Sequence, residues 1–257
     1  MEDPREAQRL TEKVDSNLWV EDHLLPRFRG QTILDVGCGP GVLAQAAAKV
    51  LPESMVTGLE RSEDRFVVAT QNLDGLDNAR VVRGDVIEMP FESEHFDFVY
   101  TRFMLEYLPN PEIAIREMVR VCRPGGKVML QDLDGQLVWH YPLDPNLQPM
   151  LQTVIEYMAQ TGFDPFIGRK LFSMAKAAGL SDIEVQTETY HLYPGKIDEE
   201  NYHLWELKLE IALPIIERAL ESASMAIELK ERFLAYLAKD DTLTYSTLFT
   251  VTGTKLG

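Results

Sequence analysis

The sequence predicts an α/β protein whose core is a doubly wound, mostly parallel sheet. Short apolar runs alternate with helical segments through the first half of the chain, which is typical of parallel strands joined by crossover helices. A run rich in β-branched residues at 242–252 predicts a final strand. A chain of 257 residues can bury one complete core. Because nothing marks a boundary between independent units, we expect a single domain over residues 1–257.

Each expected element follows from its local pattern. Six strands are expected before the final one, at 33–36, 55–59, 79–83, 96–100, 127–130 and 183–193. Helices are expected at 42–51, 64–73, 111–121, about 148–161 and 168–178. Residues 198–239 read as almost wholly helical. There we expect Pro214 to begin a new helix and Ser222 or Ser224 to cap another.

The most informative stretch is residues 33–44, Ile-Leu-Asp-Val-Gly-Cys-Gly-Pro-Gly-Val-Leu-Ala. An apolar strand runs into a turn with glycines at alternate positions, and a helix starts at once. Glycine accepts positive φ and has no Cβ to hold a ligand away, and the first N–H groups of a helix are unpaired. This pattern predicts a ligand held closely by bare backbone.

The position of the acid beside this loop indicates the kind of ligand. Gly37, Gly39 and Gly41 depart from the G-x-G-x-x-G spacing of dinucleotide-binding loops. Asp35 would repel the pyrophosphate of a dinucleotide but would attract an ammonium group. A nicotinamide oxidoreductase is therefore a disfavoured alternative.

The stretch resembles the first motif of class I S-adenosylmethionine (SAM) dependent methyltransferases, acid-x-Gly-x-Gly-x-Gly. The Arg-Pro-Gly-Gly turn at 123–126 and the strand at 245–255 resemble the same family. The resemblance covers about residues 30–193 and returns at the last strand, and it is closest to the ubiquinone/menaquinone-type and small-molecule branch. It implies a Rossmann-like, seven-stranded sheet of order 3-2-1-4-5-7-6 with an antiparallel last strand, and SAM as the methyl donor.

The resemblance also implies which residues hold SAM, since ligands of open α/β sheets lie beyond the carboxyl ends of the strands. Glu60 would bind the ribose hydroxyls, Asp85 would accept from the adenine amino group, and Val86 would offer a backbone N–H to the ring. The full predicted set is Asp35, Gly37, Cys38, Gly39, Gly41, Glu60, Arg61, Asp85, Val86 and Arg102.

Three segments are expected to cover the site. Residues 1–28 read as an N-terminal helical lid, because such a segment usually crosses the cofactor mouth in this family. Residues 136–167 and 196–240 are helical segments that we expect to cover the substrate. The second of these replaces the short hairpin that usually joins the last two strands of the family.

If the acceptor is neutral, a base should take its proton. Many relatives carry a histidine near Tyr107, which this chain lacks. The predicted catalytic residues are His140 and Asp132, followed by Asp134, then His191 and His203. The aromatic neighbours of these candidates, Trp139, Tyr141 and Trp205, indicate either a flat, hydrophobic acceptor or packing beneath a lid.

The composition of the chain argues against several classes of function. A net charge of −16 disfavours nucleic-acid partners. No apolar run is long enough to span a bilayer, and the two cysteines match neither a disulfide framework nor a metal motif. We expect a cytoplasmic monomer or homodimer without a metal, which methylates a small organic acceptor and releases S-adenosylhomocysteine. A protein methyltransferase that attracts a basic chain, and a SAM-binding regulator without turnover, stay as alternatives.

Overall fold

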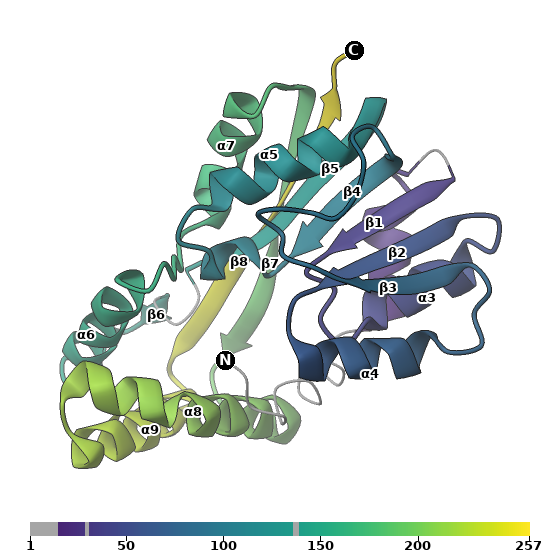
Figure 1. Cartoon of the computed structure of the whole chain (residues 1–257). Helices are drawn as coiled ribbons and strands as arrows, with labels where there is room; N and C mark the ends of the chain where they lie inside the picture. The colour runs from purple at the N-terminus through teal and green to yellow at the C-terminus, as the bar shows by residue number, and fades with distance from the viewer. Residues whose placement is uncertain (1–14, 29–30, 136–138) are drawn as a thin grey trace.

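The computed structural model describes residues 15–28, 31–135 and 139–257 (Figure 1). Its centre is a sheet in which the strands follow the order β3-β2-β1-β4-β5-β8-β6, with β7 paired to the other edge of β8. The strands are β1 (Thr32–Val36), β2 (Met55–Glu60), β3 (Ala79–Arg83), β4 (Phe96–Arg102), β5 (Cys122–Asp134), β6 (His140–Tyr141), β7 (Leu180–Pro194) and β8 (Leu243–Lys255).

The sheet confirms the predicted order. Strands β1 to β5 are mutually parallel, whereas β8 is antiparallel to β5 and β7 is antiparallel to β8. The sixth and seventh strands of the prediction are therefore β7 and β8. The two-residue strand β6 was not predicted, because its pairing of His140 with Thr244 and of Tyr141 with Leu243 joins residues about a hundred positions apart.

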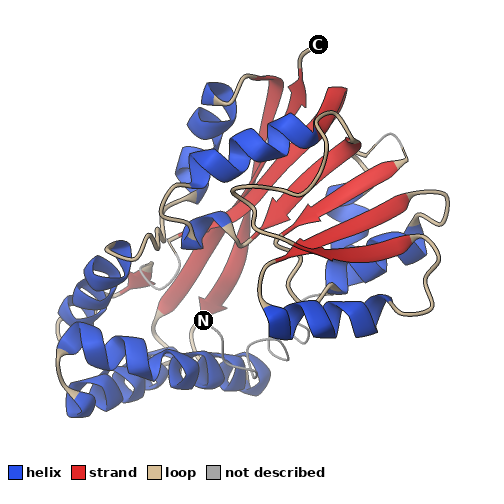
Figure 2. Cartoon of the chain, viewed as in Figure 1, coloured by secondary structure: helices blue, strands red, loops and turns tan. Residues whose placement is uncertain are grey.

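Helices cover both faces of the sheet, with α5 and α7 in front and α3 behind in the view of Figures 1 and 2. The α-helices are α2 (Ser16–Trp19), α3 (Val42–Val50), α4 (Glu63–Leu73), α5 (Pro111–Val121), α6 (Leu147–Ala159), α7 (Leu171–Ala177), α8 (Glu199–Leu220) and α9 (Ala223–Leu237). Shorter turns are the π-helix η1 (Val20–Leu24) and the 3-10 helices η2 (Leu105–Tyr107) and η3 (Gly168–Lys170).

One helix boundary was predicted wrongly. Pro214 lies inside α8 and does not begin a new helix. Proline removes one helical hydrogen bond, but Ile211 and Ile216 on either side of it are buried. Burial of this apolar face keeps the helix continuous. The prediction for the next helix is confirmed, since the Ser222 side chain accepts a hydrogen bond from the Met225 N–H and caps α9.

Helices α6, α8 and α9 form a unit at one end of the sheet, which we call the helical cap (Figure 1). They share a core separate from the two cores that flank the sheet, built around Trp205, Leu209 and Phe233. The cap combines the predicted segments 136–167 and 196–240, of which residues 136–138 lie outside the described residues. Its role as a cover for the substrate stays a prediction.

The first part of the predicted N-terminal lid, residues 1–14, lies outside the described residues. Residues 15–28 are partly helical, and Trp19, Val20, Leu24 and Phe28 are buried against α3 and the sheet. The indole N–H of Trp19 donates to Oε1 of Gln131 on β5 at 2.7 Å. This segment is therefore anchored to the sheet, and its function as a lid stays a prediction.

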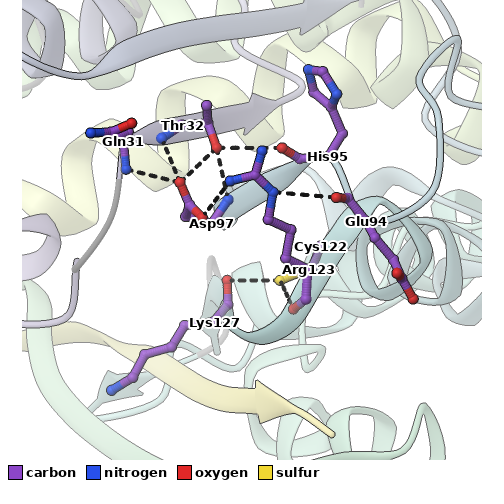
Figure 3. A network of polar contacts seen from close by, with 8 residues as sticks. All are labelled: Gln31, Thr32, Glu94, His95, Asp97, Cys122, Arg123 and Lys127. Atoms are coloured by element: carbon purple, nitrogen blue, oxygen red, sulfur yellow. Dashed lines mark hydrogen bonds and ion pairs between the residues drawn. The ribbon is translucent and has the colours of Figure 1, made fainter. Parts of the chain in front are cut away.

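A polar network ties together the amino ends of β1, β4 and β5 (Figure 3). Oδ2 of Asp97 accepts from the backbone N–H groups of Gln31 and Thr32 at 2.8 and 2.9 Å. Arg123, from the predicted Arg-Pro-Gly-Gly turn, donates to Oδ1 of Asp97 at 2.8 Å. Burial alone would raise the Asp97 pKa, but these hydrogen bonds outweigh it and lower the pKa. The network fixes the strands at the end opposite to their carboxyl termini.

Candidate active site

A cavity of about 430 Å³ opens at the carboxyl ends of the parallel strands. Its first part, here called the glycine side, lies at the carboxyl ends of β1, β2 and β3 and at the starts of α3 and α4. It is lined by Asp35, Gly37, Cys38, Gly39, Pro40, Val42, Leu43, Glu60, Arg61, Arg65, Asp85 and Val86. Its second part, the far side, comes from the segment after β4, the end of β5 and the helical cap. Arg102, the last residue of β4, also lines it.

All three glycines of the loop adopt positive φ, at +73° for Gly37, +57° for Gly39 and +77° for Gly41. A Cβ on Gly37 would lie 2.8 Å from Cγ of Met104, so the loop is pressed against the segment that follows β4. A Cβ on Gly39 would meet no atom within 4 Å. Gly39 therefore presents bare backbone to open space in the cavity, as the sequence predicts.

Glu60 ends β2 and fastens the glycine loop. Its side chain is buried, with Oε2 accepting from the Gly39 N–H at 3.0 Å and Oε1 accepting from the Ser62 N–H at 2.8 Å. The Arg65 guanidinium lies 3.4 Å from Oε1. Because each carboxylate oxygen has two lone pairs, Glu60 keeps capacity for hydroxyl donors of a ligand while it holds the loop.

Asp35 lies under the same loop, on β1, next to Tyr100 of β4. It is 3% exposed, and its Oδ2 atom makes no hydrogen bond within the described part of the chain. Burial raises the Asp35 pKa to about 7; the Tyr100 hydroxyl opposes the rise, Glu60 adds to it and Arg102 opposes it. A buried carboxyl oxygen without a partner fits a ligand that brings a positive charge or a hydrogen-bond donor.

The remaining predicted cofactor residues also line the cavity. Arg61 and Asp85 form a solvent-exposed ion pair at 3.5 Å. The Cys38 thiol has a strongly raised pKa because it is buried, with Asp35 and Glu60 adding to the rise, so it stays protonated. Arg102 donates from Nε to Oε1 of Gln131 at 3.1 Å. The structure thus brings all ten predicted residues to one cavity, or, for Gly41, to the loop that bounds it.

The far side of the cavity is mostly apolar. Its wall consists of Phe103, Met104, Glu106, Tyr107, Leu108, Leu133, Met158, Thr161, Phe163, Lys208 and Ile215. Several of these residues are aromatic, and the rings of Tyr107 and Phe163 lie 5.5 Å apart. Met158 comes from α6, while Lys208 and Ile215 come from α8. The helical cap and the sheet therefore enclose one space together.

The two predicted catalytic residues lie in different places. Asp132 is wholly buried directly behind the far wall, where its Oδ2 accepts from the backbone N–H of Glu106 at 3.2 Å. His140 contributes to a separate hollow of about 60 Å³ beside α6, with its Nδ1 2.9 Å from Oγ1 of Thr244. Nothing in this geometry tests either catalytic role, and both stay predictions.

The other acid and histidine candidates have structural partners. Asp134 forms a two-point ion pair with Arg169. His191 is buried, with Nδ1 2.7 Å from Oγ of Ser246, and His203 is paired with Glu206 on the surface of α8. Among the described residues that line the large cavity, none is a histidine.

Comparison with known proteins agrees with this geometry. Residues 34–130 match a family described as a methyltransferase domain. Over 169 residues the chain is 38% identical to a demethylmenaquinone methyltransferase of Staphylococcus aureus, and the match spans 65% of this chain and 64% of that protein. The family match at residues 34–130 contains the glycine loop, Glu60 and Asp85.

Residues 34–130 form a methyltransferase domain of the class I SAM-dependent type.

Solved structures share the fold of the methyltransferase domain. The YcgJ protein from Bacillus subtilis superposes with a TM-score of 0.61 at 17% identity, covering 94% of this chain and 99% of that one. Phosphoethanolamine N-methyltransferase 2 from Haemonchus contortus, bound to phosphomonomethylethanolamine and S-adenosylhomocysteine, gives 0.60 at 21% identity, covering 95% of this chain and 53% of that one. At these identities the likeness concerns the fold.

Two findings apply to the described residues of the chain. In residues 15–28, 31–135 and 139–257, no helix is both long and apolar enough to cross a membrane. Within the same ranges, no group of three or more His, Cys, Asp or Glu side chains could hold a metal ion.

Three charged residues line the cavity without being in the predicted set: Arg65, Glu106 and Lys208. Glu106 carried a usable signal, since it is an acid within the apolar run from Phe103 to Leu108 and follows the fourth strand. Lys208 carried none, because its position on a helix in the second inserted segment resembles any surface lysine. Its ammonium group lies 4.8 Å from the ring centre of Trp205.

Proposed function

We propose that this protein transfers the methyl group of SAM to a small organic acceptor with a flat, apolar body. One observation carries the proposal: a single cavity joins the glycine side to an apolar far side that is closed partly by the helical cap. A donor bound at the glycine side and an acceptor bound at the far side would share that space. Holding two reactants in this way converts a bimolecular reaction into an effectively unimolecular one.

The residues of the glycine side fit SAM, which supplies an electrophilic methyl carbon when bound. Glu60 would accept from the ribose hydroxyls, and Asp85 would accept from the adenine amino group. The unpaired oxygen of Asp35 favours a cationic ligand over an anionic one. Gly39 leaves room for the ligand to touch the backbone. The same residues disfavour a nicotinamide dinucleotide, whose pyrophosphate would lie near the Asp35 and Glu60 carboxyl groups.

The far side supports a small acceptor. Aromatic and aliphatic walls favour burial of a flat, apolar molecule, and α6 and α8 contribute residues to those walls. The relative from Staphylococcus aureus is named for an acceptor of this kind, demethylmenaquinone. We extend the proposal to the helical cap as the cover over the acceptor and to residues 1–28 as the lid over SAM.

A thermal-shift experiment tests the donor. SAM at a hundred times its dissociation constant should raise the free energy of unfolding by about 2.7 kcal/mol, whereas NAD should give no shift. A shift with NAD and none with SAM would contradict the proposal.

A labelling experiment separates the acceptor classes. The protein is incubated with methyl-labelled SAM and either a metabolite extract or a protein extract, and a Glu60→Ala variant serves as the control without donor binding. We expect label in the metabolite fraction only. Label in the protein fraction would favour a protein methyltransferase, and no label in either, despite SAM binding, would favour a regulator without turnover.

A further inference from the structure

Two buried acidic residues, Glu106 and Asp132, are joined at the wall of the far side. Glu106, in η2, lines the cavity although it is only 2% exposed. Asp132 lies behind it at the end of β5 and has no exposed surface. The Glu106 N–H donates to Oδ2 of Asp132 at 3.2 Å, and the Leu133 N–H donates to Oδ1 at 2.9 Å. The backbone thus fixes the Asp132 carboxyl group and places Glu106 between it and the cavity.

The third acid of this region, Asp134, has a different role. Arg169 donates to its Oδ2 from Nε at 2.7 Å and to its Oδ1 from Nη2 at 2.6 Å. This ion pair neutralises Asp134 and joins η3 to the end of β5. The hydrogen bonds that Asp132 accepts from described residues come from backbone amides, which carry no full charge.

Burial and like charge act together on the inner pair. Burial, followed by the neighbouring Glu106 carboxylate, raises the pKa of Asp132 well above its usual range. Two carboxyl groups in such a site retain a proton that either alone would release, so the pair titrates as a unit. Among the residues that the structure describes, charged and titratable groups near Glu106 include Asp164, which donates its backbone N–H to the Glu106 carbonyl, and Arg102, Lys208 and Tyr107 on the cavity wall.

Glu106 also lies close to the donor's expected position. Met104, two residues earlier, packs against Gly37, which is why Gly37 has no room for a Cβ. The short segment from Met104 to Tyr107 therefore runs from the glycine loop into the far side. Glu106, on this segment, lines the space where an acceptor would approach the methyl group.

We propose that Glu106 receives the proton of the acceptor's hydroxyl group, and that Asp132 is a positioning residue that acts through Glu106. The acceptor class that follows is a neutral molecule with a hydroxyl group on a flat, apolar body. This inference rests on the proposed function. In the transfer, a bond forms between the acceptor's nucleophilic atom and the methyl carbon. The bond between that carbon and sulfur breaks, and its electron pair goes to sulfur. The hydroxyl proton goes to Glu106.

A pair of matched probes tests this role by binding. Calorimetry would measure the affinities of 2-naphthol and 2-methoxynaphthalene for protein saturated with S-adenosylhomocysteine. The two probes differ only in that a methyl group replaces the hydroxyl proton. Hydrogen bonds to a charged group contribute about 1.5–3 kcal/mol. We therefore expect 2-naphthol to bind at least about tenfold more tightly than the ether.

Variants test whether Glu106 causes the tighter binding of 2-naphthol. Glu106→Gln keeps the side-chain shape but removes the charge, and it should reduce the preference to less than about threefold. Glu112→Gln, at an exposed position of α5, is the matched control and should leave it unchanged. Asp132→Asn leaves one ionising carboxyl group at the site, so the pH profile of the preference should change from that of a coupled pair to that of a single ionising group. A purely structural role of Asp132 would weaken both probes without moving this pH profile.

Several results would overturn the assignment of Glu106. They are equal affinities of the two probes in the wild type, an undiminished preference in folded Glu106→Gln protein, or no binding of either probe. SAM affinity, measured in the same instrument, separates this failure from failure of the proposed function. If SAM binds normally to wild type and Glu106→Gln while the probes show no preference, only the inference about Glu106 fails. If SAM does not bind to the wild type, the proposed function fails with it.

Discussion

Gly39 donates its backbone N–H to Oε2 of Glu60 at 3.0 Å, which joins the loop after β1 to the end of β2. The loop that would touch the cofactor and the carboxylate that would hold its ribose are therefore parts of one hydrogen-bonded unit. Ser62 and Arg65 contact the other oxygen of Glu60, so its orientation is set before any ligand arrives. Such preorganisation reduces the entropy that a ligand must remove on binding.

Glu60→Ala should lower the affinity for SAM at least about tenfold, since the variant loses both the ribose acceptor and the contact that holds Gly39. Calorimetry with SAM measures the effect. Glu53→Ala, at an exposed position before β2, is the matched control and should bind SAM as the wild type does. Wild-type affinity in folded Glu60→Ala protein would contradict the site as described.

Asp35→Asn should make the cofactor-free protein more stable at pH 8. Because burial raises the Asp35 pKa from 3.8 to about 7, the folded state holds a proton that the unfolded chain releases between these values. The free energy of unfolding of the wild type should then fall as pH rises through this window, by up to about 1.4 kcal/mol per pH unit. The variant lacks this loss, and it should also bind SAM more weakly.

Urea denaturation at pH 5.5, 6.5, 7.5 and 8 measures this dependence for Asp35→Asn and the wild type. Asp77→Asn, at an exposed position, serves as the control and should follow the wild type. Stability curves for Asp35→Asn and wild type that run parallel over this range would show that Asp35 does not hold its proton.

Gly39→Ala and Gly75→Ala form a matched pair. Both glycines have positive φ and room for a Cβ, but only Gly39 faces the cavity. Each substitution should cost about 1–2 kcal/mol of stability from backbone strain. Thermal unfolding should show similar losses, whereas SAM binding should be abolished in Gly39→Ala alone. Loss of SAM binding in both variants, or in neither, would contradict close contact at Gly39.

Asp134 and Arg169 should show a measurable coupling free energy. Arg169→Ala leaves the Asp134 carboxylate buried without its two charged hydrogen bonds, and we expect a loss of about 1–2 kcal/mol, because the Arg169 side chain is half exposed. A double-mutant cycle with Asp134→Asn, followed by urea denaturation, isolates the pair. Strictly additive effects of the two substitutions would rule out the ion pair as a source of stability.

Local patterns in the sequence were sufficient for the framework of the site. The glycines at 37, 39 and 41 permit positive φ whatever surrounds them, and alternation of apolar and polar residues predicts where strands end. Since parallel strands bring their carboxyl ends to one edge, Asp35, Glu60 and Asp85 could be placed together without coordinates. The antiparallel last strand was likewise predicted, through the resemblance to the family.

Packing between distant segments decided the rest. Glu106 and Asp132 are 26 residues apart, and the hydrogen bond from the Glu106 N–H to the Asp132 side chain exists only once β4 and β5 are aligned. Lys208 reaches the cavity because buried apolar contacts hold α8 against α6 and α9. The same contacts keep Pro214 within a continuous helix and place His140 at a separate hollow. Sequence thus determined the elements and the edge where they act, because both depend on local geometry. Only the tertiary structure determined which charges face the far side, because that depends on how the cap packs.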